Sequence, residues 1–78
     1  MSFYSVDELQ KIGFAKIGTN VYISRKTSIY NPSKISIGSN VSIDDFCVLS
    51  AGLNGIEIGN YVHVAVFLFI DGTRQNNP

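Results

Sequence analysis

The sequence of 78 residues contains no tryptophan, two prolines, one cysteine and one histidine, and only 15% of its residues are charged. A single cysteine excludes a disulfide bond within the chain. One histidine and one cysteine are too few for the ligand clusters of zinc sites, so no metal cofactor is expected. Cys47 lies between Phe46 and Val48 and is predicted to be a small buried side chain, because a free cysteine packs as a modest hydrophobe.

An excess of charge of either sign is also missing. The chain has six basic and six acidic residues, and the basic residues are scattered along it. No nucleic-acid-binding surface is therefore expected. No apolar run reaches the roughly 18 residues of a membrane-spanning helix, and the N-terminus lacks the basic stretch of a secretory signal. These absences predict a soluble, cytoplasmic protein without a membrane span.

The sequence does contain an internal repeat. Three segments read aliphatic, Gly, two polar or turn residues, Val, variable and aliphatic: Ile17–Ile23, Ile37–Ile43 and Ile58–Val64. Within them aliphatic residues recur every sixth position, a period that fits neither a helix nor simple strand alternation. It fits short strands separated by regular bends. These aliphatic positions are Ile17, Ile23, Ile29, Ile37, Ile43, Leu49, Ile58, Val64 and Ile70.

This period predicts an all-β parallel β-helix of about three coils. Each coil would contain three strands, so that Ile17, Ile37 and Ile58 stack over one another around a narrow core. The fifth residue of each six-residue unit should share the inward face of the residue two places further on, where the next unit begins. Those partners are Val21, Thr27, Ser33, Val41, Cys47, Leu53, Val62 and Leu68. The repeats start 20 and 21 residues apart, and the surplus residues are expected in bulges at Ile35-Ser36 and at residues 53–57. A β-sandwich is the alternative, but it would not repeat one glycine in one frame.

Residues outside the repeat predict a cap and a tail. Ser5 and Glu8 are spaced as in a capping box, and Gly13 marks a helix end, so a short helix should cover the N-terminal end of the coils. We therefore expect a single domain over residues 1–78, with a cap at 3–14, coils at 15–70 and a polar tail at 71–78. Residues 64–70 are nearly all apolar and no helical cap follows them, which suggests a truncated chain or a covering partner.

The three segments IGTNVYIS, ISIGSNVSIDDF and IEIGNYVHV resemble the hexapeptide-repeat acyltransferases. The opening FYSVDELQKIGF resembles members of that family that O-acetylate sugars during the synthesis of surface polysaccharides such as lipopolysaccharide. The resemblance covers about residues 3–70. It implies left-handed coils, a homotrimer, acetyl-CoA as co-substrate bound between subunits, and a sugar or nucleotide-sugar acceptor. Members are typically more than twice this length, so the resemblance implies an N-terminal fragment that is inactive alone.

The same resemblance implies a histidine that acts as general base on the acceptor hydroxyl or amine, and His63 is the single histidine of the chain. It should point outward beside Val62, where it is either catalytic or a surface or interface residue. Asp44 and Asp45 form an acidic pair at a bend. They would bind the acceptor or orient a histidine of a neighbouring chain, or they are simply a solvated turn. At the level of the whole chain, the alternative function is a non-catalytic β-helical assembly module.

Overall fold

The computed structural model describes residues 2–65 and 69–72, without the side chains of Phe69 and Asp71. Helix α1 (Val6–Ile12) precedes nine strands in the described residues. The first coil holds β1 (Lys16–Ile17), β2 (Val21–Ile23) and β3 (Ser28–Tyr30). The second holds a 3-10 turn (Pro32–Lys34), β4 (Ile35–Ile37), β5 (Val41–Ile43) and β6 (Val48–Ser50). The third holds β7 (Ile56–Ile58), β8 (Val62–Val64) and β9 (Phe69–Asp71).

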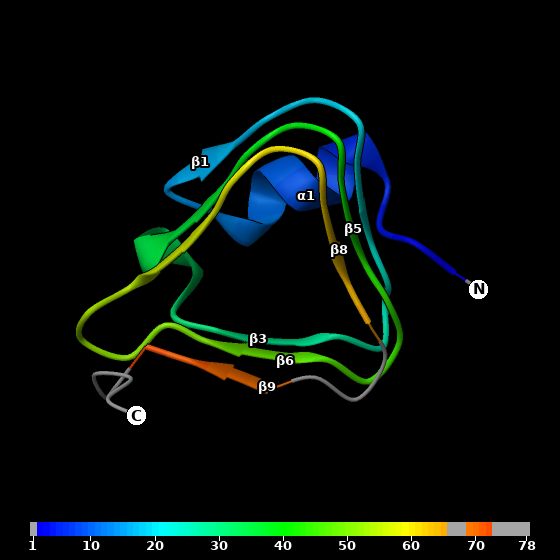
Figure 1. The fold of residues 1–78 in the computed structure, drawn as a ribbon. Coiled ribbons are helices and arrows are strands. Elements are labelled where there is room, and N and C mark those ends of the chain that lie inside the picture. Colours follow the sequence, from blue (N-terminus) through cyan, green and yellow to red (C-terminus); the bar gives the residue numbers. More distant parts are fainter. Residues whose placement is uncertain (1, 66–68, 73–78) are drawn as a thin grey trace.

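The strands form three parallel sheets that make the sides of a triangular prism (Figure 1). Their orders are β1-β4-β7, β2-β5-β8 and β3-β6-β9, so each strand pairs with the equivalent strand one coil away. The predicted fold class, an all-β parallel β-helix with a short N-terminal helix, is confirmed. The division of the chain into cap, coils and tail remains a prediction. No helix among the described residues is long and apolar enough to cross a membrane.

The register is the one that the repeat predicts. Ile37 pairs with Ile17 on one side and with Ile58 on the other, and Ile43 pairs in the same way with Ile23 and Val64. Side chains on such strands alternate between the two faces, so the stacked aliphatics meet inside the prism. The buried apolar core consists of Leu9, Val21, Ile23, Ile35, Ile37, Val41, Ile43, Cys47, Leu49, Ala51, Ile58 and Val64.

Bends between the strands explain the recurring Gly and Asn. Asn20 and Asn40 both adopt left-handed backbone conformations, which Asn tolerates better than most residues. Their side chains are stacked, and Asn20 Nδ2 donates a hydrogen bond of 3.1 Å to Asn40 Oδ1. A Cβ on Gly38 would lie 2.8 Å from the Gly59 carbonyl carbon. Glycine is therefore needed where one coil passes directly over the next.

Two of the predicted inward positions are wrong. Ser33 is exposed in the 3-10 turn, and Leu53 is 85% exposed in the loop before β7. Ile35, predicted to lie in a bulge, is instead a fully buried strand residue that pairs with Ile56. The reason is strand alternation: the inward partner of Ile37 must lie two residues before it, so the surplus residues are accommodated earlier, at the corner. Leu68 lies outside the described residues.

Helix α1 closes the N-terminal end of the prism, as predicted (Figure 1). Ser5 is its N-cap, and both hydrogen bonds of the capping box with Glu8 are present. Gly13 ends the helix in a left-handed conformation with a φ of 90°. Leu9 is the buried residue of the helix and belongs to the same apolar cluster as the coils.

The cap is also tied to the first coil by an ion pair. Glu8 Oε2 accepts a hydrogen bond of 2.7 Å from Arg25 Nη1, and Glu8 Oε1 is paired with Arg25 Nη2. The Arg25 hydrogen bonds, with that from the Ser5 backbone, lower the pKa of Glu8 from its ordinary 4.5 to about 2. A carboxyl group whose pKa is lower in the folded state than in the unfolded state stabilises the fold at any pH above its unfolded-state pKa. This stabilisation is lost as the pH falls toward the folded-state pKa.

We therefore predict that the attachment of α1 weakens between about pH 4.5 and pH 2. Both side chains are about two-fifths exposed, so solvent screens the pair and the effect should be small. The protection factors of the α1 amides, which are exchange rates corrected for the intrinsic pH dependence of exchange, should fall at the acid end of this range. Glu8→Gln should remove this part of the pH dependence. Titration of the Glu8 carboxyl at its ordinary pKa would contradict the predicted ion pair.

Candidate active site

The predicted site residues lie on the outer face of the β2-β5-β8 sheet. Ser42 is the outward residue of β5, and Asp44 follows two residues later on the same side of the chain. His63 is the outward residue of β8 and pairs directly with Ser42 in the strand register. Stacking of the third coil on the second thus places one imidazole opposite two polar side chains that are two residues apart.

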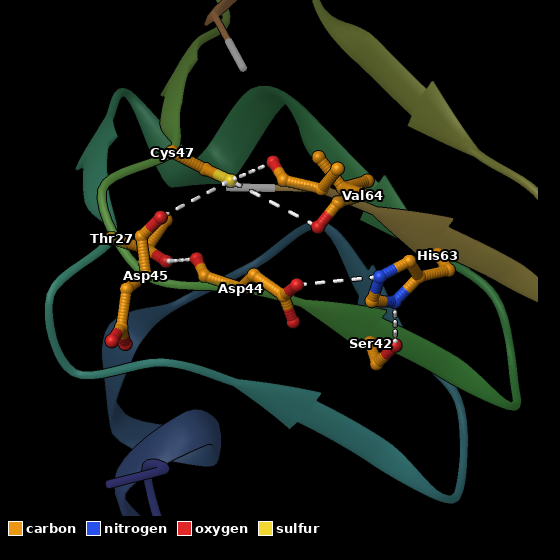
Figure 2. Close-up of polar contacts among 8 residues, drawn as sticks. Thr27, Ser42, Asp44, Asp45, Cys47, His63 and Val64 are labelled. Carbon is orange, nitrogen blue, oxygen red and sulfur yellow. Dashed lines mark hydrogen bonds and ion pairs between the residues drawn. The ribbon is translucent and has the colours of Figure 1, made fainter. Parts of the chain in front are cut away.

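Each nitrogen of the His63 ring faces one of these side chains (Figure 2). Ser42 Oγ lies 2.6 Å from His63 Nδ1, and Asp44 Oδ2 lies 3.3 Å from His63 Nε2. The side chain of His63 is 60% exposed, whereas that of Asp44 is 24% exposed. The arrangement is therefore a surface Ser–His–Asp cluster that solvent and ligands can reach.

The polypeptide around Asp44 is fixed from two sides. The Asp44 amide donates a hydrogen bond of 3.0 Å to the Val64 carbonyl, which joins it to the third coil. The buried Thr27 hydroxyl donates one of 3.1 Å to the Asp44 carbonyl, which joins it to the first coil. These two hydrogen bonds fix the main chain of Asp44 beside the third coil, on the side where His63 lies.

Asp45 does not join this cluster. Its Oδ1 accepts a hydrogen bond from the hydroxyl of Ser24, a fully buried residue of the first coil. The two acidic residues therefore face different partners. Asp44 lies beside the histidine of its own chain, and Asp45 helps to hold the corner between coils. A direct contact of Asp45 with an acceptor stays a prediction.

Cys47 is fully buried, as the sequence predicts. Its Sγ lies 2.8 Å from the carbonyl oxygen of Ala65, so the thiol also bridges the second and third coils (Figure 2). Its place among the core residues fits a packing role. Among the described residues, no group of three or more His, Cys, Asp or Glu side chains is placed to hold a metal ion.

Ser42 is the site residue that the sequence reasoning missed. The repeat alignment already places Ser42 and His63 in the same frame position of consecutive coils, so their contact was available from the sequence. Ser42 also borders an open groove of about 440 Å³ on the side away from the third coil, lined by Asn20, Tyr22, Asn40, Val41 and Ser42.

The geometry favours one protonation pattern. With a neutral ring, an Nε2–H group faces the Asp44 carboxylate, which leaves Nδ1 to accept the Ser42 hydroxyl proton. A nucleophile, a base and a group that orients the base are then within reach of one another. Such a cluster can take a proton from a hydroxyl or an amine and return it to a leaving group.

A parallel β-helix with a short N-terminal helix is the architecture of the acyltransferases that this chain matches. The chain is 50% identical over 72 residues to dTDP-4-amino-4,6-dideoxy-D-glucose acyltransferase of Escherichia coli, a match that covers 92% of the chain and 38% of that relative. No family model matches the sequence. The chain thus spans about two-fifths of the length of the curated relative.

Solved structures give the same result. AntD, an N-acyltransferase from Bacillus cereus in complex with dTDP and 3-hydroxybutyryl-CoA, matches with a TM-score of 0.87 and 56% identity over 94% of this chain and 37% of AntD. A variant of AntD in complex with dTDP-4-amino-4,6-dideoxyglucose and coenzyme A matches with the same TM-score and identity. That match covers 38% of the AntD variant. The homologues of this chain are therefore sugar acyltransferases.

Proposed function

We propose that this chain forms the N-terminal coils of an enzyme that transfers an acyl group from an acyl-CoA to the amino group of a dTDP-linked aminodeoxy sugar. The observation that carries the proposal is the 50% identity to such an acyltransferase, which extends over 92% of the chain. The sequence left a hydroxyl or an amine as acceptor. The names of the relatives favour the amine, because AntD is an N-acyltransferase and was solved with a 4-amino sugar nucleotide.

His63 is proposed as the general base of this reaction. A sugar amine is largely protonated near neutral pH and must lose a proton before or during its attack on the acyl carbonyl. The imidazole is exposed, and Asp44 lies where it would stabilise the cation that forms after proton uptake. The proton would reach Nδ1 through the Ser42 hydroxyl, which occupies that side of the ring. Asp44 and Asp45 are proposed as acceptor-binding residues, with Asp45 using the carboxylate oxygen that Ser24 does not hold.

We propose an acyl-CoA as donor and a homotrimer as the assembly. Structures of AntD contain coenzyme A or 3-hydroxybutyryl-CoA, which supports an acyl-CoA donor, and acetyl-CoA remains the sequence-based choice. A homotrimer in the cytoplasm is proposed from the resemblance described above. Tyr22, Tyr30 and Tyr61 are 52%, 58% and 82% exposed, and tyrosine is enriched at such interfaces.

A chimera tests the proposal. The segment of AntD that matches this chain is replaced by the corresponding residues of the chain, and release of coenzyme A is measured with acetyl-CoA and with 3-hydroxybutyryl-CoA. We expect release that depends on dTDP-4-amino-4,6-dideoxyglucose. His63→Gln in the chimera should lower kcat by about 10²-fold, the lower end for loss of a general base, and change KM little.

The matched control is Ser36→Ala, which changes an outward strand residue on another side of the prism and should leave the rate unchanged. A folded chimera that releases no coenzyme A in response to the amino sugar would contradict the proposed function. It would instead favour the alternative of a non-catalytic assembly module. An active chimera that is unaffected by His63→Gln would retain the function but remove His63 from the catalytic role.

A further inference from the structure

We propose that Ser42 is a nucleophile that takes an acyl group onto its own oxygen, with His63 as its base and Asp44 as the residue that orients the base. This activity concerns the reactivity of the three coils themselves and does not require the sugar-acyltransferase function. Three features of the outer face of the β2-β5-β8 sheet support it: the hydrogen bond at Ser42, the environment of the ring, and the groove in front of the hydroxyl.

The first feature is the contact between nucleophile and base. A serine hydroxyl is a weak nucleophile unless an adjacent base accepts its proton during attack, and this requires a separation of about 2.6–3.2 Å. Ser42 Oγ and His63 Nδ1 are 2.6 Å apart. The two residues are direct partners in the β5–β8 register, so the rigid ladder between coils sets the distance.

The second feature is the group on the far side of the ring. Asp44 Oδ2 lies 3.3 Å from His63 Nε2, and the main chain of Asp44 is held by Val64 and Thr27. A carboxylate at this nitrogen favours the tautomer with its proton on Nε2 and stabilises the imidazolium that forms when Nδ1 takes the serine proton. This role makes Asp44 a positioning residue, because it acts through His63.

The third feature is space for a substrate. The open groove lined by Asn20, Tyr22, Asn40, Val41 and Ser42 lies toward the first coil, whereas His63 belongs to the third. A carbonyl group bound there would approach Ser42 from the side opposite its base. Asn40 accepts a hydrogen bond from Asn20 through Oδ1, and no described residue accepts one from its Nδ2. That amide is available to donate to the carbonyl oxygen, where negative charge develops during attack.

The step balances without a further reactant. Ser42 Oγ forms a bond to the carbonyl carbon of an activated ester or thioester, its proton passes to His63 Nδ1, and the phenolate or thiolate leaves. His63 then releases that proton to the leaving group or to solvent. An amine or water attacks the new ester and gives a proton to His63. The bond between the acyl carbon and Ser42 Oγ breaks, and His63 passes this proton to the serine oxygen.

The 78-residue chain is treated with p-nitrophenyl acetate, and phenolate release, intact mass and peptide mapping are followed together. We expect one acetyl group on Ser42 and an initial burst of phenolate. Ser42→Ala should abolish the burst, and Ser42→Cys should restore an acyl-accepting side chain. His63→Gln should slow acetylation of Ser42 by about 10²-fold, as expected for loss of a general base, with a smaller loss for Asp44→Asn.

Ser36→Ala is again the matched control, because Ser36 is an outward serine of β4 that pairs with Lys16 and Glu57 and has no imidazole beside it. It should leave the burst intact, and Ser36 itself should stay unmodified in the wild-type chain. Acetyl groups found only on lysines, tyrosines, the N-terminus or His63 would overturn the proposal, as would a burst that survives in folded Ser42→Ala. Failure here would leave the chimera result, and hence the proposed function, unaffected.

Discussion

Ile43→Ala is expected to lower the free energy of unfolding by about 2–5 kcal/mol, the range for truncation of a large aliphatic in a packed core. Ile43 is fully buried and occupies the middle of a stack with Ile23 and Val64. Its loss leaves a cavity between two coils, and the parallel strands on either side cannot close it without breaking their own register. Urea unfolding followed by circular dichroism measures the change.

A chain of this size is only marginally stable, and Ile43→Ala could prevent folding. Ile43→Val is therefore the milder variant, with an expected decrease in the free energy of unfolding of about 0.5–1.5 kcal/mol. The matched control is Leu53→Ala, because Leu53 is 85% exposed and was expected from the repeat to point inward. It should change the free energy of unfolding by less than about 0.5 kcal/mol. A loss at Leu53 equal to that at Ile43 would contradict the assignment of the core.

Gly38→Ala should destabilise the chain by about 1–3 kcal/mol, as overpacking does in well-packed proteins. A Cβ at Gly38 would lie 2.5 Å from Asn60 Oδ1 and 2.8 Å from the carbonyl carbon and oxygen of Gly59. The Asn60 side chain can move, but the Gly59 main chain is held in the third coil. Relief of the contact therefore requires the two coils to separate at this corner.

Gly59→Ala provides the comparison, since Gly59 occupies the same frame position one coil later. A Cβ there would meet no described atom within 4 Å. The substitution should be neutral or should stabilise the chain slightly, because alanine restricts the unfolded state more than glycine does. The difference between the two variants isolates the contact between coils from the intrinsic effect of replacing glycine. Equal losses in both would show that this contact does not explain the repeated glycine.

The fold was predictable because aliphatic residues recur every sixth position, and this period determines which residues stack on one another. Ile17, Ile37 and Ile58 share a frame, and the structure pairs them directly. The corners were less predictable. Ser33 and Leu53 occupy inward positions of the six-residue repeat but lie in a turn and a loop. The inward positions of the next coil begin instead at Ile35 and Ile56, the first residues of β4 and β7. A period fixes the strands and leaves the path between them undetermined.

The site was predictable in part for the same reason. His63 was expected to point outward, and strand alternation is enough to place it there. The separation of Asp44 from Asp45 was not predictable, since it depends on the hydrogen bond that Asp45 accepts from Ser24, a residue one coil away. The contact of Ser42 with His63 can be predicted by aligning the outward residues of successive repeats. The inward residues, which predict the core, carry no information about it.

The register between the second and third coils brings Ser42 and Asp44 to the two nitrogens of His63. Nitrogen-15 NMR of the His63 imidazole in the 78-residue chain, at a pH where the ring is neutral, measures this most directly. We expect the tautomer protonated at Nε2, ring contacts to both side chains, and a shift of the Nδ1 resonance in Ser42→Ala. A ring protonated at Nδ1, or one without contacts to Ser42 and Asp44, would contradict this arrangement.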